Sequence, residues 1–194
     1  MSSEPTTKER IVFASAELFR RQGFTGTGVK QIVAAAQAPF GSLYHHFPGG
    51  KEQLGEQVIR VAGGFYGVLV EEVIDPAPDL VGGVEQFFSL AGVHLAESGY
   101  QDACPIATIT LETASSSESM RQASADVFEG WLAKLADRFA AAGIAPATAR
   151  PLALATLSLL EGAFILCRAA RTTEALDAAG AQAAAAVRAA LPGA

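Results

Sequence analysis

Side chains able to perform covalent or metal chemistry are few and scattered in this sequence. His45 and His46 are adjacent, but no third ligand lies at helical spacing from them, so we expect no metal site there. Cys104, His94 and Glu161 have the chemistry of a nucleophile, a base and an acid. No nucleophile–base string, phosphate-binding loop or metal motif surrounds them. We therefore expect neither an enzyme nor a bound cofactor.

A second set of polar side chains lies between residues 27 and 51, where the pattern suits contact with DNA. Apolar residues at helical spacing occupy 29–36, and a break follows at 37–39. Leu43 and Phe47 then lie four residues apart, on one side of a second, shorter helix. Two short helices joined by a tight turn indicate a helix-turn-helix, whose second helix enters the major groove.

An ordered string of residues makes this interpretation more specific. The string consists of Gly23–Thr27, Val29, Ile32, Ala36, Gly41–Pro48 and Lys51–Leu54. It resembles the TetR-type repressor domain, and the extra glycine before Lys51 resembles the LmrA/YxaF-like subgroup. A weaker resemblance extends over residues 104–107 and the last two helices.

The resemblance implies an all-α fold with two domains. A three-helix, helix-turn-helix DNA-binding head is expected at 1–50, and a helical-bundle body for ligand binding and dimerisation at 51–194. The composition agrees, because half the residues are hydrophobic and no alternating valine-rich run suggests strands.

Capping signals and periodicity predict where individual helices begin. Thr6 with Glu9, and Ser115 with Glu118, have the spacing of capping boxes. Further helices are expected at 51–73, 84–98 and 174–191, with another that begins at Pro146 or Pro151. The three glycines within 63–67 indicate close helix packing, which we favour over a flexible joint.

The expected recognition helix, 39–46, contains no Lys or Arg. Gly41 allows the helix to approach the duplex closely, and Phe40 can contact a thymine methyl group. Ser42 and His45 can hydrogen bond to a base edge, or His45 to a phosphate. Four further side chains are expected to contact phosphates, the tyrosine by family resemblance: Tyr44, Thr27, Lys30 and Lys51. The alternative for the tyrosine is to cover the small core of the head.

The charge distribution favours docking through the N-terminal part. The net charge is −6, but residues 1–60 contain seven Lys and Arg against five Glu, a net charge of +2. The remainder has seven against fifteen, a net charge of −8. Two cysteines without zinc-ligand spacing and a polar N-terminus fit a reducing cytoplasm.

The last two predicted helices are candidates for a dimer interface. Residues 152–171 are apolar nearly all round, and 174–191 are rich in alanine. Because Glu161 and Arg168 interrupt the first of these, we expect a helix buried on two sides rather than a membrane span. One head reads only a few base pairs, so a homodimer reading a palindrome is expected, as the resemblance also implies. A core helix of a monomer is the alternative.

The resemblance further implies a small-molecule pocket in the body. Aromatic residues are numerous there, and a few polar groups, including Glu112, lie in apolar contexts. The candidate lining residues are Phe65, Phe88, His94, Cys104, Thr108, Phe128, Trp131, Glu161 and Phe164. A buried carboxylate at Glu161 needs Arg168, a partner subunit, a proton or a cationic ligand. Most of the aromatics, taken singly, are equally explained as core.

Together these patterns predict a dimeric, ligand-responsive transcriptional regulator, with repression favoured over activation. It would bind a palindromic operator and be released by a small, largely apolar or aromatic effector. The alternative is a small-molecule-binding helical protein with no role on DNA, which leaves the ordered string from Thr27 to Leu54 unexplained.

Overall fold

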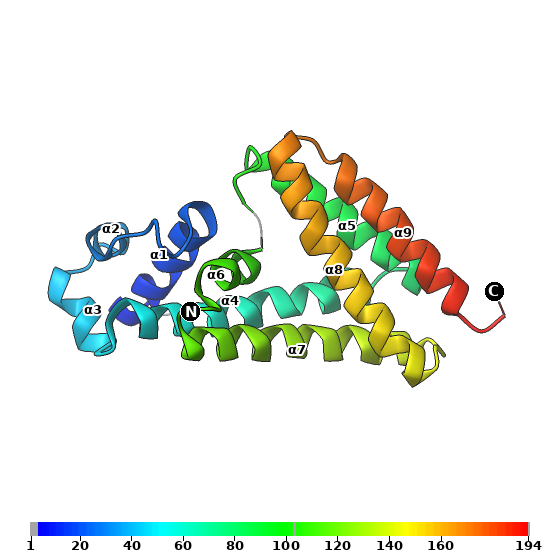
Figure 1. Ribbon diagram of the computed structural model, residues 1–194, viewed down its shortest axis with the longest axis horizontal. Coiled ribbons are helices and arrows are strands. Elements are labelled where there is room, and N and C mark those ends of the chain that lie inside the picture. The colour runs from blue at the N-terminus through cyan, green and yellow to red at the C-terminus, as the bar shows by residue number, and fades with distance from the viewer. Residues whose placement is uncertain (1–3, 103, 194) are drawn as a thin grey trace. The chain divides into compact units, whose positions relative to one another are not determined.

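The computed structural model describes residues 4–102 and 104–193, and within them the chain forms nine α-helices and no strand (Figure 1). This confirms the predicted all-α fold. The helices are α1 (Thr7–Gln22), α2 (Val29–Ala35), α3 (Phe40–His46), α4 (Gly50–Val73), α5 (Leu80–Glu97), α6 (Pro105–Thr113), α7 (Glu118–Ala141), α8 (Pro146–Ala170) and α9 (Glu174–Ala190).

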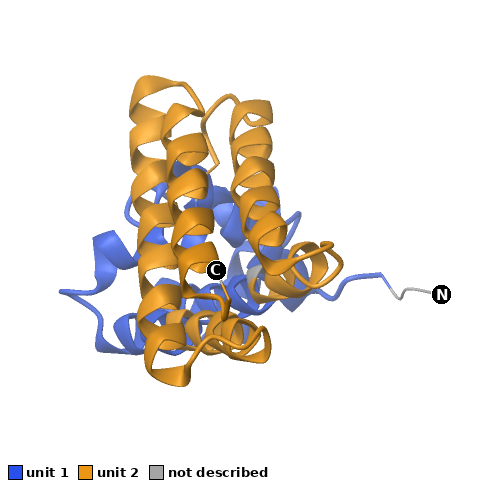
Figure 2. Ribbon diagram, turned by 90° about the vertical axis from the view of Figure 1, so that its right-hand side faces the viewer, with its two compact units in different colours: residues 1–64, 104–127 blue, residues 65–103, 128–194 orange. Residues whose placement is uncertain are grey.

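The contacts divide the chain into two compact units (Figure 2). Unit 1 comprises residues 1–64 and 104–127, and so contains α1 to α3, most of α4, α6 and the first part of α7. Unit 2 comprises residues 65–103 and 128–194. The short helices α2 and α3 therefore share a unit with α6, although α6 lies far from them in sequence.

The starts of α1 and α5 differ in how well the sequence predicted them. The capping box at α1 is confirmed: the Thr6 N–H donates to Glu9 Oε2 at 2.7 Å and the Glu9 N–H to Thr6 Oγ1 at 3.3 Å. The predicted start of α5 was four residues late, because Asp79 Oδ1 accepts from the Gly82 N–H and caps a helix beginning at Leu80.

The capping box predicted at Ser115 is wrong. The hydroxyl group of Ser117, the residue before α7, accepts from the Met120 N–H at 3.4 Å. The same hydroxyl donates to the Glu52 carboxylate of α4. This contact from a distant helix, together with the local cap, places the helix start two residues later than the sequence pattern indicated.

Unit 1 is built on a small apolar core. Phe19 of α1, Ile32 of α2 and Leu43 of α3 are all fully buried. Leu54 of α4 and Ile109 of α6 are buried in the same unit. Each of the helices is thus held by apolar side chains on one face, as the helical periodicity predicted for α1 to α3.

Unit 2 has a core in which α9 packs against both α5 and α8 (Figure 1). Gly180 of α9 lies so close to α5 that a Cβ atom there would be 2.7 Å from Phe88 Cβ. The buried side of α8 includes Leu152, Leu160 and Cys167. Its other side is exposed, so the expected burial of α8 on two sides is not achieved within one chain.

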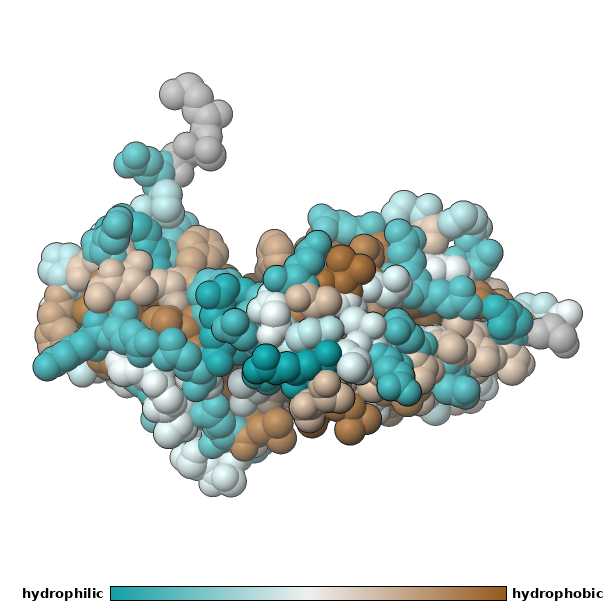
Figure 3. Space-filling view, turned by 90° about the horizontal axis from the view of Figure 1, so that it is seen from above, coloured by the Kyte–Doolittle hydropathy of each residue, from teal (hydrophilic) through white to brown (hydrophobic). Residues whose placement is uncertain are grey.

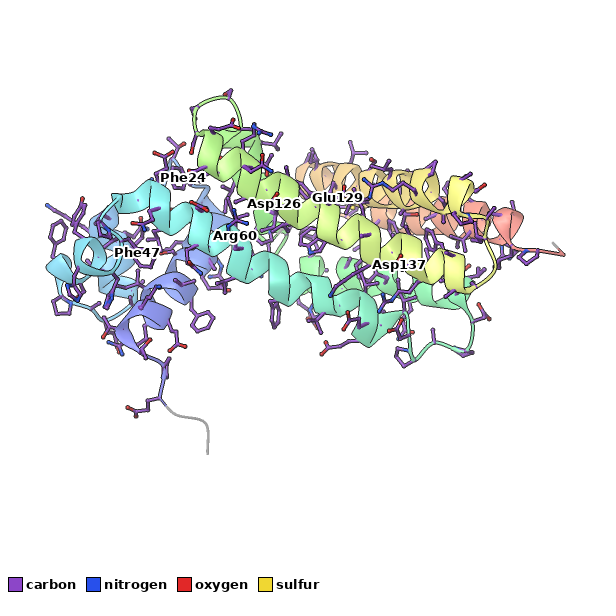
Figure 4. The ribbon with its side chains drawn as sticks, turned by 90° about the horizontal axis from the view of Figure 1, so that it is seen from below. Phe24, Phe47, Arg60, Asp126, Glu129 and Asp137 are labelled. Atoms are coloured by element: carbon purple, nitrogen blue, oxygen red, sulfur yellow. The ribbon has the colours of Figure 1, made fainter. Side chains whose placement is uncertain are left out.

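Glycines in α4 permit close helix packing, as we favoured from the sequence. A Cβ atom at Gly63 would lie 2.5 Å from Val127 in unit 1, and one at Gly67 would lie 3.2 Å from Trp131 in unit 2. Gly64 has open space around it. Ion pairs accompany this packing: in unit 1 Arg60 of α4 bonds to Asp126 of α7 at 3.1 Å (Figure 4).

By length and composition alone, α8 is apolar enough to cross a membrane, although 33% of its most apolar window is buried. A single such helix is a weak indication of a span, and α8 packs along α9 in unit 2. The exposed large apolar residues elsewhere, seen as brown areas in Figure 3, are distributed among polar ones.

Substituting Gly180 tests the close packing of α9 on α5. Gly180→Ala should lower the free energy of unfolding by about 1 kcal/mol, because overpacking costs roughly 1–3 kcal/mol and the gain in helix propensity offsets about 1 kcal/mol. Gly130→Ala, where the new methyl group meets no atom within 4 Å, should instead raise it by up to about 1 kcal/mol. Urea unfolding followed by circular dichroism measures both, and equal shifts in the two variants would contradict the packing described.

Candidate nucleic-acid interface

The turn between α2 and α3 is closed by two backbone hydrogen bonds. The Gln37 N–H donates to the Ala34 carbonyl at 3.1 Å, and the Ala38 N–H donates to the Val33 carbonyl at 2.9 Å. Together they form a Schellman motif, whose left-handed position usually holds glycine. Here Gln37 has a φ of +50°, so a residue with a side chain occupies the left-handed position that glycine usually takes.

Arg10 supports this turn from α1. Its Nε donates to the carbonyl of Ala36 at 3.2 Å, and its other nitrogens bond to Pro5 and Thr7 at the start of its own helix. The role of Arg10 was not predicted, because it lies 26 positions before Ala36 and no periodic pattern links the two. Arg10 thereby connects the start of α1 to the end of α2.

The helix α3 has one buried and one exposed side. Leu43 and Phe47, at its end, are buried as predicted. Phe40 and Tyr44, four residues apart, are half-exposed, with ring centroids 6.2 Å apart. A Cβ atom at Gly41 would meet no atom within 4 Å, so the glycine is not required by packing within the chain. These exposed residues are therefore two aromatic residues and a glycine, without Lys or Arg.

The remaining predicted base contacts share that surface. His45 is exposed, and its ring lies edge-on to that of His46 with centroids 4.9 Å apart. Ser42 is half-buried near the start of α3. Among the described residues no cluster of three potential metal ligands is found. The histidine pair thus offers hydrogen-bonding groups at the end of α3.

Two lysines lie close to α3 in the sequence and belong to the same unit. Lys30 is exposed on α2. Lys51, in the first turn of α4, is half-buried, with its Nζ 4.2 Å from the centroid of the Phe24 ring (labelled in Figure 4). Burial lowers the pKa of Lys51, and the nearby Glu112 carboxylate opposes that shift. The ammonium group is therefore held by an aromatic face and a carboxylate rather than by water alone.

Thr27 does not fit the phosphate contact predicted for it. Its side chain is 0% exposed, and its hydroxyl donates to the Gly23 carbonyl at 2.8 Å. The hydroxyl thereby closes the turn before α2, and its proton is already used within the chain. The physical role of this threonine is to shape the turn, which a sequence match alone does not reveal.

The predicted ligand-lining residues divide between the two units. Cys104 and Thr108 lie in unit 1, where the Cys104 Sγ accepts from the Ala107 N–H at 3.4 Å and caps α6. The other seven lie in unit 2, where Phe128 and Trp131 of α7 form an edge-to-face pair with centroids 5.5 Å apart.

The seven predicted lining residues of unit 2 differ in how far they are buried. Phe88 is fully buried against Gly180, and Phe164 packs against the same core. Phe65 is 70% exposed, and Glu161 is half-buried. The His94 side chain is 79% exposed and lies 3.7 Å from Glu97, so the structure does not place it in an apolar pocket. Within unit 2, Phe128, Trp131 and Phe164 are half-buried.

Comparison with protein families matches both parts of the chain. Residues 11–58 match the model of bacterial regulatory proteins of the tetR family. Residues 81–182 match the model of the transcriptional regulator LmrA/YxaF-like C-terminal domain. The chain is 31% identical over 166 residues to the uncharacterised regulator YxaF of Bacillus subtilis, covering 86% of this chain and 87% of YxaF.

Other relatives agree in sequence and fold. The chain is 26% identical over 167 residues to the regulator LmrA of Bacillus subtilis, covering 86% of this chain and 89% of LmrA. It is 33% identical over 178 residues to an uncharacterised transcriptional regulator of Mycobacterium tuberculosis, covering 88% of each. A TetR regulator from Legionella pneumophila has the same fold, with a TM-score of 0.82, 21% identity and coverage of 94% of this chain and 97% of that one.

The matched family and relatives are transcriptional regulators and not enzymes, as the scattered reactive side chains led us to expect. The helix-turn-helix seen in α2 and α3 lies inside the matched N-terminal region. The chain therefore belongs to the TetR family of DNA-binding transcriptional regulators and has a C-terminal domain of the LmrA/YxaF-like kind.

Proposed function

We propose that this regulator is a cytoplasmic homodimeric repressor. It binds a palindromic operator through the exposed side of α3 in each protomer, and a small, largely apolar or aromatic effector releases it. The observation that carries the proposal is that α3 buries Leu43 and Phe47 and presents Phe40, Gly41 and Tyr44 outward. A helix held in this way is ready to enter a major groove.

The residues at the start and end of α3 determine which DNA sequence the protein binds. Phe40 contacts a thymine methyl group, and the absence of a side chain at Gly41 lets the helix approach the base edges. Ser42 and His45 add hydrogen bonds to bases, or to a phosphate in the case of His45. Since no basic side chain reads guanine here, the operator is expected to be selected through methyl groups and close fit.

Phosphate contacts supply register and orientation. Tyr44 donates its hydroxyl proton, while Lys30 and Lys51 bring charge, and the positive end of the α4 dipole adds to Lys51. The net charge of +2 over residues 1–60, against −8 over the rest, orients these groups toward the DNA.

Filling the space at Gly41 separates folding from DNA binding. Gly41→Leu should leave the unfolding midpoint unchanged or higher, because a Cβ atom at this position meets no atom within 4 Å and leucine favours the helix. It should weaken binding at least about tenfold to a duplex that the wild-type chain has selected from a random library, since the side chain blocks close approach. Fluorescence anisotropy measures the affinity, with Gly130→Leu as the matched control. Unchanged affinity would contradict the assigned face, and failure to enrich any duplex would contradict DNA binding itself.

The exposed side of α8 supports the dimer. Ile165 and Leu166 are 59% and 62% exposed, and Leu154 and Leu159 share that side. Helical spacing places the exposed Gly162 between these pairs, which lets another helix approach closely. The exposed side of α9 is formed mostly of small residues: Ala178, Ala181, Ala185 and Ala189. Two such helices from each protomer can make a four-helix bundle.

A charge on this side of α8 tests the dimer. Leu166→Glu should weaken dimerisation by about a hundredfold or more, because the two-fold axis places two desolvated carboxylates in one interface. Operator affinity should fall with it, since a monomer brings only one head to the operator and loses the gain from linking two. Sedimentation equilibrium at several concentrations measures the association. Val93→Glu, at another exposed apolar position of unit 2, should have no such effect. If Leu166→Glu dimerised as tightly as wild type, the interface would lie elsewhere.

The effector class follows from the side chains available to hold it. The half-buried aromatics Phe128, Trp131 and Phe164 offer flat apolar contacts, and the half-buried Glu161 offers a polar anchor. An effector can release the operator only if it binds more tightly to the form of the dimer whose heads do not match two successive grooves.

A further inference from the structure

A carboxylate of α6 reaches the turn that precedes the helix-turn-helix. Glu112 Oε2 accepts the backbone N–H of Thr25 at 2.6 Å, across 87 residues of sequence. Both residues belong to unit 1. A charge-assisted bond of this length is stronger than a neutral one, and it ties the turn after α1 to a helix outside the matched N-terminal region.

The turn is shaped to admit this carboxylate. A Cβ atom at Gly23 would lie 1.9 Å from Glu112 Oε1, so no other residue type leaves room for the carboxylate as it lies. Gly23 also has a φ of +77°, which disfavours a side chain independently. The Thr27 hydroxyl fixes the other end of the turn by its bond to the Gly23 carbonyl. The backbone from Gly23 to Thr27 is thus held by two side chains.

The same turn carries the aromatic ring beneath Lys51. Phe24 packs edge-to-face on Phe19 of α1, with centroids 5.2 Å apart. Its ring lies 4.2 Å from Lys51 Nζ. The charge of Glu112 also acts on that ammonium group. Glu112 therefore affects Lys51 in two ways, through the position of Phe24 and through direct attraction.

We propose that Glu112 is a positioning residue for DNA binding: by holding the turn from Gly23 to Thr27, it seats Phe24 under Lys51 and so directs Lys51 to its phosphate. The inference rests on the proposed DNA-binding role of Lys51. It assigns to α6 a part in forming the DNA-binding surface.

The direction in which DNA affinity changes separates a positioning role from a simple charge effect. Removing a carboxylate from a DNA-binding unit should by simple electrostatics strengthen binding to a polyanion. Glu112→Ala should instead weaken binding to the duplex selected by the wild-type chain, by about tenfold. Glu112→Gln should bind within about threefold of wild type, because its amide oxygen can still accept the Thr25 N–H. Glu118→Ala and Glu118→Gln are the charge-matched controls, since Glu118 pairs only with Arg121 of its own helix among the contacts seen.

A double-mutant cycle identifies the route through Lys51. In a Lys51→Ala background, Glu112→Ala should cost less than about twofold, because the group it positions is absent. The full-length variants are compared by fluorescence anisotropy, with circular dichroism to check folding. Should Glu112→Ala fail to fold, Glu112→Leu removes the acceptor at similar volume and takes its place in every comparison.

The outcomes separate this inference from the proposed function. If wild type binds the duplex and Glu112→Ala binds equally or more tightly, or if its loss is the same with and without Lys51, the positioning role is overturned. If wild type enriches no duplex, the proposed operator binding fails, and this inference fails with it. A loss that Glu112→Gln largely restores and Lys51→Ala abolishes supports it.

Discussion

Burial of Leu43 and Phe47 determines what α3 can present to DNA. A helix of seven residues is too short to be stable alone, so α3 persists only because these side chains pack into the core of unit 1. With these two side chains buried, Phe40, Gly41 and Tyr44 remain exposed on α3. The turn at Gln37, closed by backbone bonds and supported by Arg10, holds α3 against α2. The composition of the exposed side is thus a direct consequence of the core.

An exposed side without Lys or Arg shifts the source of affinity away from α3. Charge must then come from neighbouring elements, and we propose that Lys30 and Lys51, at the start of α4, supply it. The latter is partly desolvated against Phe24, whose position depends on the turn that Glu112 closes. One such head makes few contacts with DNA. We therefore propose that the exposed apolar side of α8 pairs two protomers, so that two heads bind together.

Local signals predicted much of this structure, and what they missed depends partly on local bonds, at Asp79 and Thr27, and partly on distant contacts. The capping box of Thr6 and Glu9 and the burial of Leu43 depend on residues within one or two turns, so spacing alone identifies them. The start of α7 was misplaced because Ser117 also bonds to a residue 65 positions away. Thr27 matched a family pattern, yet its hydroxyl faces inward. Glu112 was noticed only as a polar group in an apolar setting, because its partner lies 87 residues earlier.

The central claim, that an uncharged aromatic face of α3 reads bases, is tested most directly by removing single methyl groups from the DNA. Each thymine of a selected operator is replaced in turn by uracil, and affinities are measured for wild type and Phe40→Ala. The account predicts at least one thymine in each half-site whose methyl group contributes about 1 kcal/mol or more in wild type and nothing in Phe40→Ala. Equal sensitivity of the two proteins at every thymine would contradict it.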